Sequence, residues 1–395
     1  MHTQIAPGIF YTGVNERTRK HFESLWPIPY GVSYNSYLIV DEKVVLVDAS
    51  EVSMHEPHAK KIQEILGCRE IDYLVINHME PDHSGAIRDL LRLYPNMTLV
   101  GNAKTLAMVE GFYDIKPNVL LIKDKDVLET GNHRLRFYLT PMVHWPETMM
   151  TYDETTQTLF SGDAFGCFGA LNGAILDSDM ELNVYWEEMR RYYATIVGKF
   201  GIPVQNALKK LDGLPISLLC TTHGPVWKSH IAEAVNYYNQ FSQYQAEPGV
   251  VIAYGSMYGN TTLLAEKIAE ELAAQGIRRI KLWDVGVTDL SYILSDIFNN
   301  DTVILGSPVY NGALYPPMQA LMDAIRSRDI KNRNYASFGT FAWGSAPINA
   351  LVNFGEEMKW NTVYPTINQR YSLHDELFEE CRKLAVTLAD QLKQK

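Results

Sequence analysis

The chain has 395 residues, of which 46% are hydrophobic, and a formal net charge of −11. This length is too great for one ordinary domain, so we expect two, each with enough apolar residues for its own core. The acidic balance and the lack of a basic tract argue against a nucleic acid or an anionic membrane as partner.

Other features of the composition point to the cytoplasm. The longest apolar runs are only as long as strands, so no membrane span is expected, and the N-terminus shows no signal-peptide pattern. The four cysteines are scattered and never form Cys-x-x-Cys. That usage is typical of a reducing compartment, and it excludes a rubredoxin-like or iron–sulfur module within these residues.

The first part of the chain is rich in short strands. Apolar and β-branched runs predict strands at residues 9–14, 36–40, 43–48, 71–76, 119–122, 134–140, 149–152 and 158–161. Helical spacing of apolar residues predicts helices at 57–66, 104–110, 182–199 and 204–211. Strands followed by helices in two successive halves indicate helices packed around two sheets.

Residues 77–85, which read NHMEPDHSG, crowd four polar side chains into one turn. They follow the strand predicted at 71–76 and precede a helical pattern at 86–93, so they lie at the carboxyl end of a strand, where α/β sheets tend to place chemistry. The alternation His78, Glu80, Asp82, His83 is a pattern of metal ligands. Chance crowding of polar residues on a turn is the alternative explanation.

Three more residues of metal-binding type follow predicted strands. They are His144, Asp163 and His223, and each has Gly or Pro nearby that bends the backbone. Taken singly, such a residue is more often structural than a ligand. Together with residues 77–85 they favour one metal centre built from four segments.

The pattern changes near residues 246–249, where Pro248 and Gly249 interrupt a helical stretch. We expect a first domain at 1–246 and a second at 249–395. In the second, strands predicted at 250–254, 279–284, 302–306, 336–341 and 362–366 alternate with helices, the last at 375–391. This alternation is typical of a parallel sheet covered on both faces.

The loop after the first of these strands, residues 255–261, reads GSMYGNT and opens a helix. Backbone N–H groups, hydroxyls and the positive end of the helix dipole suit a phosphate. The loop lacks the lysine of a Walker loop and the glycine spacing of a dinucleotide fingerprint. It resembles the phosphate loop of flavodoxins.

Taken in order, these motifs resemble the flavodiiron proteins. The resemblance implies an α/β fold, with a metallo-β-lactamase-like αββα sandwich followed by a flavodoxin-like, doubly wound parallel five-stranded sheet. It implies that one iron is bound by His78, Glu80 and His144 and the other by Asp82, His83 and His223, with Asp163 between them. Zinc hydrolases of this fold usually have histidine where Glu80 stands, and a carboxylate there favours iron.

The same resemblance implies an FMN site. Its expected residues are Ser256, Met257, Tyr258, Gly259, Asn260, Thr261, Ser307, Pro308, Tyr310, Asn311, Gly312, Phe341, Ala342, Trp343 and Gly344. Trp343 is the candidate ring to stack on the isoalloxazine, although an aromatic residue there could instead belong to the core. Ala342 stands where the family often has glycine.

The implied activity is a reductase. Electrons from an external, rubredoxin-like donor would pass through FMN to a diiron site that reduces O2 to water, NO to N2O, or both. A deazaflavin-dependent donor is the second option. The family implies a head-to-tail homodimer, or a dimer of dimers, with Met79 and Trp145 as contacts to the FMN of the partner subunit. The alternative is a zinc-dependent hydrolase of the metallo-β-lactamase type fused to a flavodoxin domain.

Two further expectations concern the pocket above the irons. Tyr193 matches a tyrosine that the family places there as a hydrogen-bond donor to the substrate, and a packed core aromatic is the competing interpretation. Some members have a histidine from the N-terminal segment near the irons. Here that position falls near Glu23 or Ser24, while His21 stands just before them.

Overall fold

The computed structural model describes residues 3–393, which form two compact units. The first unit comprises the chain up to residue 192 together with residues 202–239, and the second comprises residues 193–201 and the chain from residue 240. The second unit thus begins at residue 240, a little before the boundary expected at 246–249, and it also includes the short segment 193–201.

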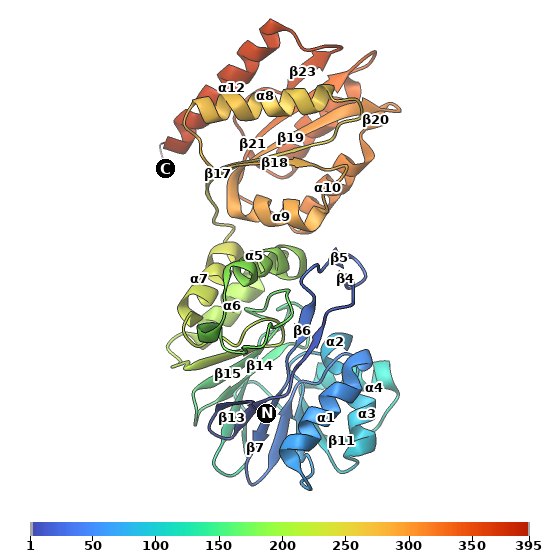
Figure 1. Ribbon diagram of the computed structural model, residues 1–395, viewed down its shortest axis with the longest axis vertical. Coiled ribbons are helices and arrows are strands. Elements are labelled where there is room, and N and C mark those ends of the chain that lie inside the picture. The colour runs from blue at the N-terminus through green and yellow to red at the C-terminus, as the bar shows by residue number, and fades with distance from the viewer. Residues whose placement is uncertain (1–2, 394–395) are drawn as a thin grey trace. The chain divides into compact units, whose positions relative to one another are not determined.

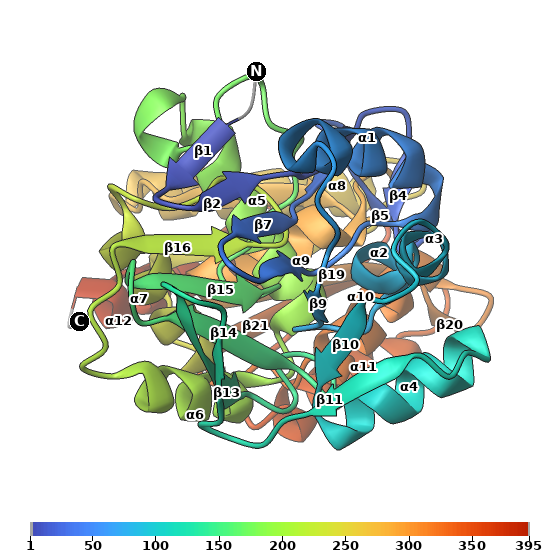
Figure 2. The same ribbon diagram turned by 90° about the horizontal axis from the view of Figure 1, so that it is seen from below.

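The first sheet of the first unit has its helices on one side. Its strand order is β1 (Thr3–Ala6), β2 (Ile9–Tyr11), β7 (Tyr37–Val40), β8 (Val44–Val47), β9 (Tyr73–Val75), β10 (Thr98–Gly101) and β11 (Asn118–Leu121). The helices are α1 (His55–Leu66), α2 (Pro81–Ser84), α3 (Ile87–Leu93) and α4 (Ala103–Tyr113), and they lie beside this sheet in Figure 2. Apolar residues of α1, α3 and α4 share one core with those of β7–β10.

The second sheet faces the first and is covered from the other side. Its order is β12 (Val127–Glu129), β13 (Arg134–Leu139), β14 (Met149–Asp153), β15 (Thr158–Gly162) and β16 (Leu218–Thr221). Beyond it come α5 (Asn183–Tyr192), α6 (Gly201–Leu211) and α7 (Ile231–Ser242). Figure 2 shows α6 and α7 along the outer side of this sheet. The predicted sandwich of two sheets between helices is confirmed.

Two small hairpins leave the first sheet near its N-terminal strands. The single strand expected at 9–14 is instead split at residues 12–13 into β2 and β3 (Val14–Glu16), which pair with different strands. β3 pairs with β6 (Val32–Tyr34), and β4 (His21–Phe22) pairs with β5 (Trp26–Pro27). The second hairpin lies next to the metal-ligand residues described below.

The second unit is a parallel sheet with helices on both faces, as expected. Its main order is β18 (Ile280–Asp284), β17 (Glu247–Tyr254), β19 (Asn300–Tyr310), β21 (Asn334–Phe341) and β22 (Asn361–Thr362). Short β20 (Ala313–Leu314) pairs with β19, and β23 (Ile367–Arg370) pairs with β21. In Figure 1, α8 (Asn260–Ala274) and α12 (Asp375–Lys393) cover one face and α9 (Leu290–Asn299) and α10 (Pro316–Ser327) the other; α11 (Asn349–Glu357) follows β21.

A second strand and one helix also differ from the sequence prediction. The strand expected at 362–366 is replaced by β22 and β23, with Pro365 between them; proline has no N–H for the sheet ladder. The helix expected at 182–199 is regular only in α5. It continues as a single π-helical turn, η3 (Tyr193–Val197), which changes the direction of the side chains that follow. Among the described residues, no helix is long and apolar enough to cross a membrane.

A buried histidine in α1 predicts a specific acid sensitivity. His58 is fully buried, and neither ring nitrogen has a hydrogen-bond partner within residues 3–393. Burial, followed by the positive charges of His55 and Lys61, lowers the pKa of His58 to about 3. In the unfolded chain His58 has an ordinary histidine pKa. The free energy of unfolding is therefore unaffected by His58 above that ordinary pKa, and it decreases as the pH falls below it.

Between pH 7 and pH 5 this residue should therefore cost about 2 kcal/mol of unfolding free energy. Urea denaturation of the wild type and of His58→Phe at the two pH values measures the difference. The variant should lose about 2 kcal/mol less than the wild type over this interval. An equal decrease in the unfolding free energy of both proteins would show that His58 does not cause the acid sensitivity.

Candidate metal centre and flavin pocket

The seven predicted ligands come together where strands of the two sheets end. Residues 77–85 follow β9, His144 follows β13, Asp163 follows β15 and His223 follows β16. β13, β15 and β16 run in the same direction, so their carboxyl ends lie at one edge of their sheet. Backbone hydrogen bonds join the two edges, including Met149 N to Asn77 O at 3.0 Å.

The first set of ligand atoms comes from His78, Glu80, His144 and Asp163, all buried. Glu80 Oε2 lies 3.2 Å from both His78 Nε2 and His144 Nε2. Asp163 Oδ2 lies 3.0 Å from His144 Nε2 and 3.5 Å from His78 Nε2. Two donors that share an ion at about 2.0–2.2 Å are separated by about this much.

The second set is Asp82, His83 and His223, also buried. Asp82 Oδ2 lies 3.3 Å from His83 Nε2 and 3.2 Å from His223 Nε2. The other Asp163 oxygen, Oδ1, lies 2.8 Å from His83 Nε2. The Asp163 carboxylate therefore has one oxygen toward each set, as a ligand shared by two ions would.

The electrostatics of this cluster favour positive charge at its centre. Burial opposes charge on the imidazoles, but the surrounding carboxylates outweigh it and raise the pKa of His83 and of His144 to about 9. The pKa of His78 is likewise raised well above its usual value. Burial alone would raise the pKa of Glu80 and Asp163, yet the imidazoles hold both below the usual range. Bound cations would balance the charges of these carboxylates in the same way that protons on the imidazoles do.

Unsatisfied polar atoms are a second sign that metal ions fit here. Both carboxylate oxygens of Asp82, together with Nε2 of His83 and of His223, have no hydrogen-bond partner within the described chain, although all three residues are buried. Such atoms are costly unless a ligand satisfies them. A donor set of imidazoles and carboxylates without sulfur suits iron.

A layer of residues that the sequence analysis missed holds the ligands in position. Glu147 is buried, and its Oε1 accepts hydrogen bonds from His78 Nδ1 at 2.8 Å and from the Met79 N–H at 2.9 Å. The Ser33 carbonyl oxygen lies 2.7 Å from His223 Nδ1. Each contact leaves Nε2 of its histidine facing the centre, which is how metal-binding histidines are usually oriented.

Asp48 supports the start of the same loop. Its two oxygens accept hydrogen bonds from the Asn77 backbone N–H at 2.8 Å and from Asn77 Nδ2 at 3.0 Å. Because Asn77 directly precedes His78, this pair fixes the backbone where the ligands begin. In the sequence, Asp48 is visible as a carboxylate at the end of the strand predicted at 43–48. No pattern near it in the sequence indicates that its partner is Asn77.

Tyr193, predicted above the irons, packs against aromatic residues of the second unit. Its ring lies 5.4 Å from that of Phe241 and 5.8 Å from that of Phe298. The preceding residue, Tyr192, has its ring 5.6 Å from that of His223. Burial, and then the charge of Asp163, raises the pKa of Tyr192 well above its usual value. Adjacent helix residues point in directions about 100° apart, so only one of the two tyrosines can face the metals.

Met79 also differs from expectation. Its side chain is fully buried in the core of the first unit, so it cannot reach the flavin of another subunit, and this prediction is wrong. Trp145 is half-buried, with its ring 5.3 Å from that of His78. Its expected contact with a partner's flavin stays a prediction.

The tip of the β4–β5 hairpin reaches the centre from outside. The Glu80 carboxylate acts on the Glu23 carboxyl electrostatically. Burial and the Glu80 charge raise the pKa of Glu23 to about 7, although His144 acts in the opposite sense. His21, by contrast, is exposed at the start of the hairpin.

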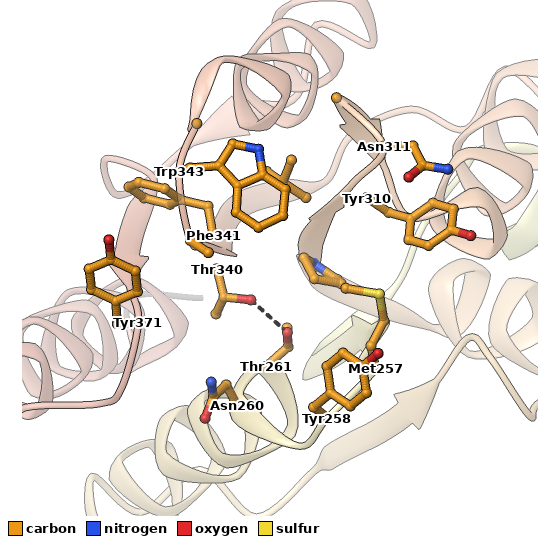
Figure 3. A pocket seen from close by; sticks show the side chains of 15 residues that line it. Met257, Tyr258, Asn260, Thr261, Tyr310, Asn311, Thr340, Phe341, Trp343 and Tyr371 are labelled. Carbon is orange, nitrogen blue, oxygen red and sulfur yellow. Dashed lines mark hydrogen bonds between the residues drawn. The ribbon is translucent and has the colours of Figure 1, made fainter.

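The second unit has a pocket of about 420 Å³ at the carboxyl ends of its strands. Figure 3 shows three loops around it, with Met257 and Tyr258 on one, Tyr310 and Asn311 on the next, and Trp343 on the third. Of the fifteen residues expected at the flavin, all but Ser256, Gly259 and Ser307 line this pocket. Val309, Thr340 and Tyr371 line it too and were missed; Thr340 Oγ1 lies 2.8 Å from Thr261 Oγ1.

The three residues outside the lining shape the loops instead. Ser256 Oγ accepts a hydrogen bond from the Gly259 N–H at 3.2 Å, and Gly259 adopts φ = 95°, a conformation that favours glycine. Ser307 Oγ accepts one from the Tyr315 N–H at 3.1 Å.

The pocket fits a flavin phosphate and ring. No side chain caps the N-terminus of α8, so its first N–H groups face the loop 255–261, as a phosphate site requires. Trp343 is 91% exposed and Tyr258 94% exposed, an unfavourable state for large aromatic rings that a planar ligand would relieve.

Removing the Glu147 carboxylate should loosen the metals. We expect Glu147→Ala to lower iron affinity about 10- to 100-fold, because His78 loses the acceptor that orients it. Glu147→Gln should lower it less, since an amide oxygen can accept both hydrogen bonds. Iron per chain after dialysis against a chelator measures this, with exposed Glu129→Gln as control. Equal retention in all four proteins would contradict the role of Glu147.

Removing the Trp343 ring should weaken flavin binding. We expect Trp343→Ala to raise the Kd for FMN about fivefold to tenfold, the loss of one aromatic stacking contact. Titration of FMN into flavin-depleted protein, followed by quenching of flavin fluorescence, gives the constant. Val287→Ala is the control, because Val287 is 86% exposed and does not line the pocket. An unchanged Kd for Trp343→Ala would place the ring elsewhere.

Comparison with known proteins identifies both parts of the chain. Residues 32–224 match the family described as ODP family beta lactamase, and residues 252–383 match the flavodoxin family. The anaerobic nitric oxide reductase flavorubredoxin of Escherichia coli is 30% identical over 326 residues, which are 81% of this chain and 68% of the relative.

Two solved structures are similar over nearly the whole chain. The rubredoxin oxygen:oxidoreductase of Desulfovibrio gigas has a TM-score of 0.95 and 26% identity, covering 100% of this chain and 99% of that one. A flavo di-iron protein variant from Thermotoga maritima has a TM-score of 0.90 and 25% identity, covering 99% and 98%. With its two matching domains and these similarities over nearly its whole length, this chain belongs to the family of flavodiiron proteins.

Proposed function

We propose that this enzyme reduces O2 to water, NO to N2O, or both, with electrons delivered by a separate rubredoxin-like protein. The observation that carries the proposal is the position of Asp163, whose two oxygens face two ligand sets built from buried imidazoles and carboxylates. Similarity to an oxygen reductase and to a nitric oxide reductase supports both substrates. Bound FMN would supply single electrons, and bound iron would supply the place where a diatomic gas is reduced.

The residues of the chain divide this work between them. Trp343, Tyr310 and the loop 255–261 hold and orient the flavin in an open pocket. The seven ligands hold the metals in a site where each is at most 8% exposed, so bulk water has little access. Glu147 and Ser33 keep the ring nitrogens of His78 and His223 directed at the centre.

We also propose a head-to-tail homodimer, or a dimer of dimers, in a cytoplasmic setting. The two sites belong to separate units of the chain, and a partner subunit would bring a flavin beside a metal centre. Half-buried Trp145, in contact with the ring of His78, is the residue we expect at that junction. Full activity from a monomer would contradict the arrangement.

The test of function uses protein loaded with iron and FMN and reduced through rubredoxin, with electrodes for O2 and NO in parallel. Consumption of either gas supports the proposal, and the faster of the two identifies the preferred substrate. Reduction of the flavin without consumption of either gas would refute it. Rates with a chemical reductant in place of rubredoxin show whether the donor matters.

Tyr192 and Tyr193 provide an internal comparison. Tyr192→Phe should lower the rate of gas consumption about tenfold, the value of one hydrogen bond near the reacting molecule. Tyr193→Phe should leave the rate within twofold, because that ring packs on Phe241 and Phe298. Iron and FMN content must match the wild type in both. A larger loss for Tyr193→Phe would reverse the assignment made here.

A further inference from the structure

The residues at the end of β23 form a fourth loop at the flavin pocket, beyond the three expected from the sequence. β23 pairs with β21 so that Arg370 lies opposite Phe341, and the Tyr371 N–H donates a hydrogen bond to the Phe341 carbonyl at 3.0 Å. Tyr371 therefore lines the pocket, as Figure 3 shows. The segments 341–344 and 369–372, which are apart in the sequence, meet at the flavin site.

The conformation of this fourth loop is both strained and fixed. Tyr371 has φ = 62°, a value that is rare for a bulky side chain. The side-chain amide of buried Gln369 donates hydrogen bonds to the Arg370 carbonyl at 2.8 Å and to the Ser372 carbonyl. Strain of this kind persists where the surrounding structure enforces it, often where a ligand is held.

Arg370 joins the fourth loop to the third. Its Nε donates a hydrogen bond to the Ala342 carbonyl at 3.0 Å, and its guanidinium carbon lies 4.7 Å from the centre of the Tyr371 ring. Ala342 and Tyr371 both line the pocket. A hydrogen bond and a cation–π contact thus hold the guanidinium beside two lining residues, although Arg370 itself is exposed to solvent.

The charge of Arg370 has no equivalent in the wall of the pocket. None of the fifteen described residues that line it has a charged side chain. Reduction of bound FMN by two electrons, with the uptake of one proton, adds a negative charge to its ring system. The external donor of the proposed function supplies these electrons. A fixed positive charge nearby attracts the reduced ring and has little effect on the neutral oxidised ring.

We propose that Arg370 stabilises the reduced state of the bound flavin and so raises the potential at which FMN accepts electrons. The inference rests on the flavin site of the proposed function and names the residue that sets the driving force for its first step. Arg370 does this as a positioned charge, without contributing to the lining of the pocket. Because the guanidinium is exposed, its effect is moderate and depends on ionic strength.

The experiment compares the wild type with Arg370→Gln, Arg370→Lys and Arg382→Gln. Glutamine removes the charge, whereas lysine keeps the charge and loses the planar guanidinium. Arg382 is exposed on α12 and does not line the pocket, so its substitution removes the same charge elsewhere in the same unit. Fluorescence titration gives the Kd for oxidised FMN, and titration with dithionite in the presence of a redox dye gives the two-electron midpoint potential. Neither measurement requires iron or a gas, so the result is separate from that of the gas-consumption test.

We expect Arg370→Gln to bind oxidised FMN within about threefold of the wild type and reduced FMN about tenfold more weakly, which lowers the midpoint potential by about 30 mV. Arg370→Lys should retain most of the wild-type potential, and Arg382→Gln should match the wild type. The difference between Arg370→Gln and the wild type should decrease in about 1 M salt, because salt screens an exposed charge.

Three results would overturn the assignment. They are an unchanged potential in Arg370→Gln, equal weakening of oxidised and reduced FMN in that variant, and an equal shift of potential in Arg382→Gln. Equal weakening of both redox states would show that Arg370 acts only on the shape of the pocket or on the phosphate. If the wild type fails to bind FMN, the flavin site is refuted together with the role of Arg370.

Discussion

The first unit depends on the Asp163 carboxylate between two sets of buried ligands. One oxygen lies 3.0 Å from His144 Nε2 and the other 2.8 Å from His83 Nε2. A buried carboxylate is strongly unfavourable unless positive charge surrounds it on both sides. The two sheets meet at this point, so the site is complete only when the sandwich has formed. Neither set of ligands is complete without segments from both sheets.

The same constraint explains the polar layer behind the ligands. A metal-binding imidazole is held in one orientation when its other nitrogen is hydrogen-bonded, and Glu147 and the Ser33 carbonyl make this contact with His78 and His223. Glu147 in turn binds the Met79 N–H, which fixes the backbone between two ligands. Met79 itself is buried in the core and so anchors the loop 77–85. Its neighbours His78 and Glu80 face the metal centre.

Local sequence patterns predicted most of the fold and the seven residues that gather in the cluster, because these signals are short-range. A strand that ends in histidine or carboxylate residues is readable without knowing its neighbours, as is a small-residue loop before a helix. What failed depended on geometry over longer distances. The choice between Tyr192 and Tyr193 is set by helix phase just before a π-helical turn, and Pro365 divided a strand that apolar content alone predicted.

Residues that support the site were missed for the same reason. Glu147 lies three residues after His144, yet it binds His78, 69 positions earlier in the chain. Thr340 and Tyr371 line the flavin pocket at the ends of β21 and β23. Only the order of strands in the sheet shows that these two ends are neighbours. A charged residue in a loop carries no sign of its partner, so its role becomes visible only when the strands are placed.

The two sites differ in their exposure to solvent. The metal centre is closed, with ligands at most 8% exposed, because fixed charges act strongly only where water is excluded. The flavin pocket is open and rimmed by Trp343 and Tyr258, each more than 90% exposed, because an electron donor must come close to the ring. The rubredoxin-like donor and the partner subunit that we propose would both need this surface. Exposed aromatic rings suit both, since they offer large contact areas without charges that would have to match two different partners.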